Sequence, residues 1–282
     1  MRAFRLIGLA ALVAVSASAQ PYVHSLTLKI KPGTAPALGA AMKKMAEANQ
    51  KNNGPTWVAA VSAFGESDKV VFLALRESLA AQEEAGKAFN QAMLKAVGPE
   101  GYAKIGASIA AITVDGRNDL LRLRPKLGYN APSDKDGILK QVGQARWIRR
   151  TAMRLKPGTD AEFTEGWNKL KEMMEKSGSK EAIGVSTSMT GPPVMYFTSY
   201  AKSLGDWDVK PPVTTPSAAQ AAEYRALLRK GGELLIGAET EIFRMTPALS
   251  NPAKEIIDCD PEFWKPKPPA PPKPKAAPPE KK

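Results

Sequence analysis

Residues 29–34 read Lys-Ile-Lys-Pro-Gly-Thr, and residues 154–159 read Arg-Leu-Lys-Pro-Gly-Thr, 125 positions later. The agreement holds at this offset as far as Leu79, which falls on Leu204, and continues beyond it at an offset of 122. Other matched pairs are Lys44 with Lys169, Glu47 with Glu172, Phe72 with Phe197, Tyr102 with Tyr224 and Arg122 with Arg244. Each copy is longer than the roughly 20–50 residues of a solenoid repeat. The chain therefore contains one small domain twice.

The hydrophobic pattern of the first copy predicts its elements. Apolar and polar residues alternate from Tyr22 to Ile30, as in a half-buried strand, and Lys-Pro-Gly-Thr ends the alternation. The remaining segments predict a helix over 36–49, strands over 57–64 and 69–75, a helix over 79–96 that resumes over 102–112, and a strand over 120–124. The second copy predicts strands over 148–155, 182–189, 194–200 and 241–245, and helices over 160–176 and 217–235.

Both copies thus have the order β-α-β-β-α-β, which is the ferredoxin-like split unit. The fold class is α+β, with two tandem units that form an intramolecular pseudo-dimer. Helices cover one face of such a sheet and leave the other face bare, so a partner must cover it. We expect the sheets of the two copies to pack face to face.

Six segments follow from these patterns. They are a signal peptide over 1–19, a first repeat over 20–125, a linker over 126–146, a second repeat over 147–250, a C-terminal extension over 251–264, and a disordered tail over 265–282. The tail is almost only Pro, Lys and Ala, a composition that does not bury a core. A short helix over 138–142 is expected within the otherwise polar linker.

The N-terminus has the three parts of a secretory signal. Arg2 and Arg5 are positive, residues 6–15 are apolar, and Ala17-Ser18-Ala19 is a small-residue cleavage site. The apolar run is too short to be a comfortable transmembrane span. We therefore expect a periplasmic or secreted protein, cleaved between Ala19 and Gln20.

The composition limits which partners, disulfides, metals and cofactors are expected. The formal net charge is +12, but the tail holds six lysines and one glutamate, and export disfavours a nucleic-acid partner. The single cysteine, Cys259, leaves no intrachain disulfide and is expected to pack near the end of the folded part. No motif with metal-ligand or nucleophile spacing is present, so we expect neither metal nor cofactor.

On the element order and the Lys-Pro-Gly-Thr strand ending, the chain resembles the dimeric α/β-barrel superfamily over 22–125 and 147–247. That superfamily includes NIPSNAP-like proteins, antibiotic-biosynthesis-type monooxygenases, stress-responsive barrel proteins and chlorite dismutases. The resemblance implies a barrel-like cavity between sheet and helices, formed here by one fused chain. Haem chemistry of the chlorite dismutase type needs a histidine on a late helix, which neither copy has.

Five residues are candidates for a ligand site. His24, the only histidine, matches Arg149 in the second copy, and such a pair on two first strands would line a pocket. Tyr196 and Tyr200 share one face of a strand, where the first copy has Val71 and Leu75. Trp57 belongs to a set of aromatic residues on strands, for which core packing is the ordinary role.

Three functions remain open from the sequence. The first is a non-enzymatic exported protein, monomeric or homodimeric, that binds a small apolar or aromatic molecule or a partner. The second is a cofactor-independent, monooxygenase-like enzyme acting on an aromatic substrate, because a dry pocket with a few polar groups is enough for that chemistry. The third is an envelope module whose basic tail contacts an anionic surface.

The signal peptide gives the first testable prediction. Protein recovered from the periplasm should have the intact mass of residues 20–282, because signal peptidase cuts after the small residue Ala19. The variant Ala19→Arg should accumulate uncleaved, since a large side chain does not fit that position. Wild-type protein that keeps residues 1–19 in the cytoplasm would contradict the prediction.

Overall fold

The computed structural model describes residues 21–208 and 218–265. The expected signal peptide over 1–19 and nearly all of the basic tail lie outside these residues, as does the proline-rich loop 211–216 between two elements of the second copy. Within the described part of the chain, no helix is long and apolar enough to cross a membrane.

The order of elements agrees with the prediction. The first repeat comprises β1 (Tyr22–Ile30), α1 (Ala35–Lys51), β2 (Val58–Phe64), β3 (Lys69–Arg76), α2 (Leu79–Ile112) and β4 (Thr113–Leu123). The second comprises β5 (Trp147–Leu155), α4 (Asp160–Lys176), β6 (Gly184–Ser188), β7 (Met195–Ala201), α5 (Ala218–Glu233) and β8 (Leu235–Met245). The expected break in α2 is a kink at Gly98, whose φ is 68°.

The repeated Lys-Pro-Gly-Thr stretch makes the same turn in both copies. Gly33 and Gly158 have φ of 79° and 80°, a region that glycine enters without steric strain. The hydroxyls of Thr34 and Thr159 each donate to the carbonyl of the lysine three residues earlier, at 2.6 and 2.7 Å. The repeat is therefore a structural device that ends the first strand and starts the first helix.

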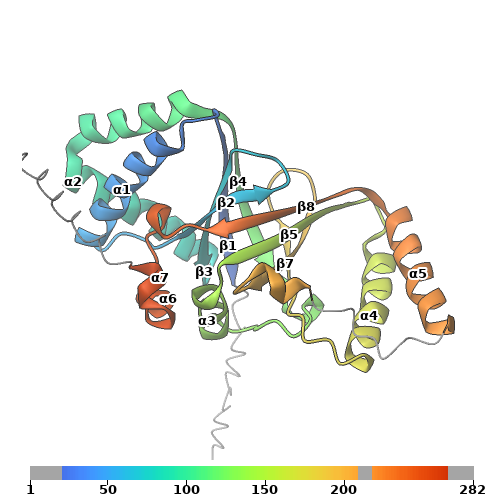
Figure 1. Ribbon diagram of the computed structural model, residues 1–282. Helices are drawn as coiled ribbons and strands as arrows, with labels where there is room; N and C mark the ends of the chain where they lie inside the picture. The colour runs from blue at the N-terminus through green and yellow to red at the C-terminus, as the bar shows by residue number, and fades with distance from the viewer. Residues whose placement is uncertain (1–20, 209–217, 266–282) are drawn as a thin grey trace, which may run out of the picture.

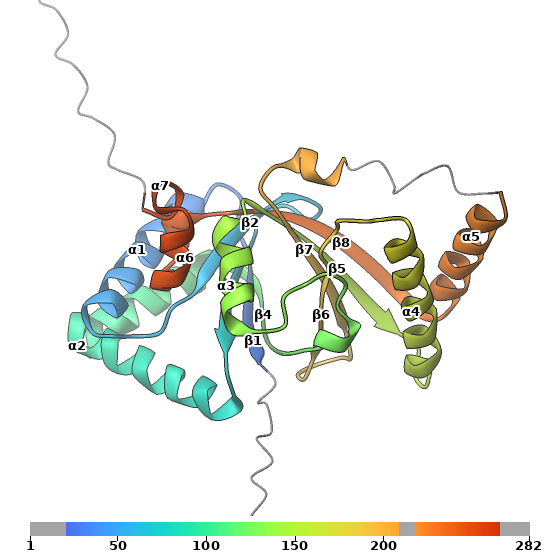
Figure 2. The same cartoon turned by 90° about the horizontal axis from the view of Figure 1, so that it is seen from below.

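The two sheets join edge to edge, which corrects the expectation that they pack face to face. The strand order is β1-β3-β2-β8-β5-β7-β6-β4, and β4 returns to β1 to close a barrel (Figures 1 and 2). Each repeat contributes four neighbouring strands, and the joints are β2 with β8 and β4 with β6. Closure leaves no sheet edge unpaired.

The last strand of each repeat is longer than predicted. The sequences of residues 113–119 and 235–240 are polar or glycine-containing and carry no strand signal of their own. They are strands because β4 pairs with β1, and β8 with β5, along nearly their whole length.

The helices lie outside the barrel, in one pair for each repeat (Figure 1). The outward side chains of β1, among them Leu28 and Ile30, pack with Leu38 and Met42 of α1. In the second repeat, Phe163 of α4 packs in the same way against Phe197 of β7. The faces that were expected to meet each other instead line the barrel interior.

The linker and the C-terminal extension close one end of the barrel. The linker forms α3 (Lys135–Gln144), longer than the short helix expected there, and the extension forms α6 (Lys254–Cys259) and α7 (Pro261–Trp264). Figure 2 shows α3 beside α6, in front of the strands in this view. Leu139, Ile256 and Trp264 join Ile148 and Phe243 in one buried cluster. The two segments outside the repeats are thus part of the core.

The linker helix α3 and the helices α6 and α7 together form a plug at this end of the barrel, and a glycine substitution tests it. A Cβ on Gly143 of α3 would lie 2.7 Å from the Cβ of Cys259, so Gly143→Ala should destabilise the protein by about 1–3 kcal/mol through overpacking. The matched control is Gly106→Ala in α2, where nothing lies within 4 Å, and it should stabilise by about 0.4–1 kcal/mol. Urea unfolding measures both changes, and equal midpoints for the two variants would refute the plug.

Candidate ligand-binding site

The alternation of each strand decides which side chains enter the barrel. On β1, Val23, Ser25 and Thr27 point inward, because the other face packs on α1. On β7 the inward residues are Tyr196, Thr198 and Tyr200, since Met195 and Phe197 pack toward α4. Every second residue of each strand therefore faces the barrel interior, where a ligand site would lie.

A cavity of about 100 Å³ lies at the plugged end of the barrel. Its walls are mainly apolar and come from both repeats and from the linker. The lining includes Val23, Val71, Leu73, Leu121, Ile148 and Phe243 from the barrel, and Ala131, Pro132 and Ile138 from the linker. The polar side chains among its lining residues include Arg150, Thr198 and Tyr200. The cavity is inside the barrel, not between sheet and helices as the resemblance implied.

Among the described residues, Arg150 is the one positively charged side chain that lines this cavity. Its guanidinium lies over the ring of Tyr196, 4.3 Å from the centroid, and its Nη1 is 3.4 Å from the hydroxyl of Ser25. Ser25 and Arg150 occupy equivalent positions of the two repeats, 125 residues apart, so equivalent points of the two copies meet across the barrel.

Tyr200 supplies a phenol to the same cavity. Burial raises the pKa of Tyr200 to about 12, although the nearby charge of Arg150 acts in the opposite direction. The hydroxyl therefore stays protonated at neutral pH and is able to donate a hydrogen bond. Tyr196 is almost fully buried, in a cluster with Leu121 and Val194.

The structure does not bring all five sequence candidates together. His24 points outward, where its Nε2 lies 2.6 Å from Oδ1 of Asn118. Arg149 also points outward, pairs with Glu181 and lies near the ring of Trp207. Trp57 packs on the helix side and donates from Nε1 to the carbonyl of Leu249 at 2.9 Å.

Matching the repeats at His24 selects Arg149, whereas its neighbour Arg150 is the residue that lines the cavity. Arg149 and Arg150 are adjacent, and strand alternation places them on opposite faces. Both faces of this strand carry an arginine, so its pattern does not show which face is inward. Arg150 pairs with Thr198, which lies between Tyr196 and Tyr200 on the inward face of β7. This register, which the pattern of β5 does not show, would have identified Arg150.

The middle of the barrel is polar. Arg117 and Asp119 of β4 form an ion pair, with Nε and Oδ2 2.6 Å apart, and Asp119 is only 3% exposed. Nearby on β1, Ser25 is fully buried and the Thr27 hydroxyl has no partner among the described residues. The apolar cavity is therefore bounded on its inner side by hydrogen-bonding groups.

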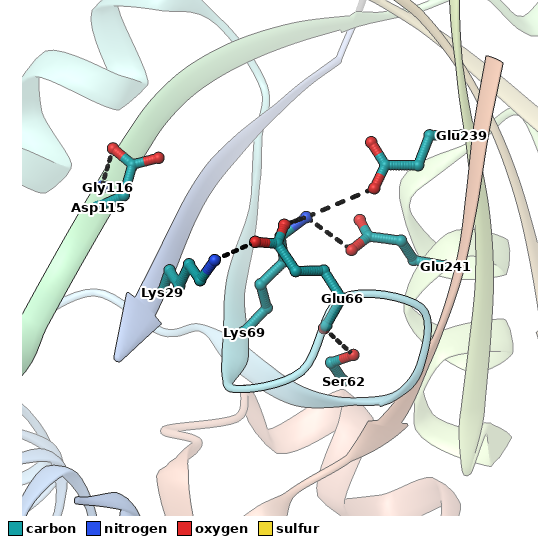
Figure 3. A network of polar contacts seen from close by, with 8 residues as sticks. All are labelled: Lys29, Ser62, Glu66, Lys69, Asp115, Gly116, Glu239 and Glu241. Carbon is teal, nitrogen blue, oxygen red and sulfur yellow. Dashed lines mark hydrogen bonds and ion pairs between the residues drawn. The ribbon is translucent and has the colours of Figure 1, made fainter. Parts of the chain in front are cut away.

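The far end of the barrel carries an ion-pair network (Figure 3). Lys69 lies 2.7 Å from both Glu66 and Glu241 and 3.8 Å from Glu239, and Lys29 also pairs with Glu66. The three carboxylates approach within 4.8 Å of one another, a spacing at which a metal ion could bind. The two lysines already supply the positive charge between them, so the group is a structural ion-pair network.

No family model matches this chain, and no curated protein matches it in sequence. Among solved structures, an anthrone oxidase-like protein superposes with a TM-score of 0.50 at 12% identity, covering 82% of this chain and 92% of that chain. A candidate monooxygenase from Fusobacterium nucleatum subsp. nucleatum gives 0.49 at 11%, covering 80% and 93%. A chlorite dismutase mutant from Candidatus Nitrospira defluvii gives 0.48 at 9%, covering 85% and 95%.

The chain has the fold of the dimeric α/β-barrel superfamily, with both barrel halves in one polypeptide. This confirms the predicted fold class and the resemblance. At such identities the likeness concerns the fold alone, so the function has to be argued from the cavity.

The ion-pair network predicts that the stability of the folded protein depends on pH. Hydrogen bonds from Lys29 and then Lys69 lower the pKa of Glu66 from 4.5 to about 2. Because the folded pKa is the lower one, the stabilisation is complete above pH 4.5 and is lost as the pH falls toward 2. Glu66→Gln should lower the urea midpoint at pH 6, and the difference from wild type should shrink at pH 2.5.

The control for this experiment is Glu100→Gln. Glu100 is exposed on α2 and takes part in no ion pair of the described chain, so its variant should follow the wild type at every pH. A Glu66→Gln difference that stays constant between pH 6 and 2.5 would show that the carboxylate charge is not the cause.

Proposed function

We propose that this protein binds a small, mainly apolar molecule in the cavity at the plugged end of its barrel. One observation carries the proposal: a mainly apolar cavity contains a guanidinium, from Arg150, and a phenol, from Tyr200. Apolar walls with a few placed polar groups are the usual composition of small-molecule sites.

The size of the cavity limits the ligand. A volume of about 100 Å³ is below the roughly 300–1,000 Å³ of sites for drug-sized ligands. It is closer to the engineered cavity of about 150 Å³ that binds benzene. A single ring, or a branched aliphatic group of that size, is therefore the ligand body that we expect.

The cavity is complete in a single chain. Its walls come from both repeats, with Leu73 and Leu121 from the first and Ile148 and Tyr200 from the second. Binding therefore needs no second copy of the protein, and a monomer that is itself a pseudo-dimer is sufficient.

Oxygenation of a small activated aromatic molecule, without a cofactor, is the second candidate. Arg150 favours it, because a cation inside an apolar cavity would stabilise an anion of the substrate. One fold neighbour is named anthrone oxidase-like, which brings this chemistry into consideration. Substrate-dependent oxygen uptake that Arg150→Gln abolishes would support this candidate over simple binding.

The site of action is also a proposal. We place the protein in the periplasm or outside the cell because residues 1–19 have the pattern of a signal peptide, and we propose that the Lys/Pro-rich tail contacts an anionic envelope surface. Removal of residues 265–282 should then shift the protein from the membrane to the soluble fraction. An unchanged distribution would dismiss the role of the tail.

A cavity-filling variant tests the binding function. Wild-type protein should bind benzyl alcohol saturably in isothermal titration calorimetry. Ala131→Phe should weaken this binding at least about tenfold, because the linker residue Ala131 lines the cavity and a phenyl group would occupy it. Ala107→Phe, on the exposed surface of α2, is the control and should bind like the wild type. Absence of saturable binding by the wild type would refute the function.

A further inference from the structure

We infer that the cavity ligand is a monocarboxylate, with its carboxylate held by Arg150 and its apolar body against the first repeat. The inference rests on the proposed binding function and adds the chemical class of the ligand. It depends on what surrounds the Arg150 guanidinium.

Arg150 has no carboxylate partner within the described chain, unlike three other arginines near it. Arg117, Arg146 and Arg149 each pair with an aspartate or glutamate. Glu241 lies directly opposite Arg150 in the β5–β8 register, but its carboxylate is bound to Lys69 at 2.7 Å. Within the described residues, a half-buried cation therefore faces a mainly apolar cavity without an ion-pair partner.

The contacts that Arg150 does make hold it in place and leave donors free. The ring of Tyr196 supports one face of the guanidinium, and only Nη1 reaches the Ser25 hydroxyl, at a long 3.4 Å. An arginine has five N–H donors in a planar fork, an arrangement that matches the two oxygens of a carboxylate. A compact phosphate or sulfate would leave the apolar walls of the cavity uncovered.

The hydroxyl of Tyr200 also favours a carboxylate ligand. Its hydroxyl stays protonated at neutral pH, because burial raises its pKa to about 12, and it lines the cavity together with Arg150. A protonated phenol donates a hydrogen bond to a carboxylate oxygen. Cation and phenol thus present donors to one anionic group.

The difference between the two repeats orients the ligand. Arg150 and Tyr200 belong to the second repeat, whereas the equivalent residues of the first are Ser25 and Leu75. The cavity wall contributed by β3 consists of Val71 and Leu73. The carboxylate therefore lies toward β5 and β7, and the apolar body toward β3.

A comparison of benzoate with benzamide tests the inference, because the two have the same ring and differ in the charge of the head group. Calorimetry at pH 7 and low salt should give about 10-fold to 100-fold tighter binding of benzoate to the wild type. Arg150→Gln should remove this preference, and far-UV circular dichroism checks that the variant is folded.

Arg149→Gln is the matched control, since it removes the same charge from the neighbouring position on the outer face. It should keep the preference for benzoate. Equal binding of benzoate and benzamide by the wild type overturns the carboxylate assignment and leaves the binding function intact. A wild type that binds neither of them, nor benzyl alcohol, overturns the function itself. A preference lost equally in both variants overturns the role of Arg150.

Discussion

Closure of the barrel by two pairs of strand edges is the constraint on which the rest of the structure depends. β2 pairs with β8, and β4 pairs with β6, so each repeat uses the other to satisfy backbone groups that would otherwise remain unpaired. The same two joints turn the bare faces of both sheets inward. A duplicated domain with an open apolar sheet thereby becomes one barrel with an interior that a ligand can occupy.

The fused arrangement has a chemical consequence. In a barrel built from two identical chains, equivalent positions carry the same residue, so a cation in the interior is always accompanied by its symmetric copy. Here Ser25 stands opposite Arg150 at equivalent positions, and Val71 stands where the second repeat has Tyr196. One chain can therefore hold a single guanidinium above an apolar wall, which makes the interior directional.

The interior is divided along its length. Lys69 forms ion pairs with three glutamates at one end, the pair Arg117–Asp119 lies in the middle, and an apolar cavity occupies the plugged end. The plug consists of segments that belong to neither repeat, and its linker part lines the cavity on the side that the strands leave open. Burial of this kind strengthens the interaction of Arg150 with any anion that enters.

The sequence by itself determined the duplication, through residues that recur at a constant offset. Its periodicity determined the order of the elements, their approximate bounds and the fold class, because these depend on local alternation and on turn residues such as Gly33 and Gly158. It also placed Tyr196 and Tyr200 on one face. Only the tertiary structure decided that the sheets join at their edges, that β4 and β8 extend through polar sequence, and that Arg150 and not Arg149 enters the cavity. Those outcomes depend on long-range strand pairing, and a shift of one position along a strand exchanges the inner and outer faces.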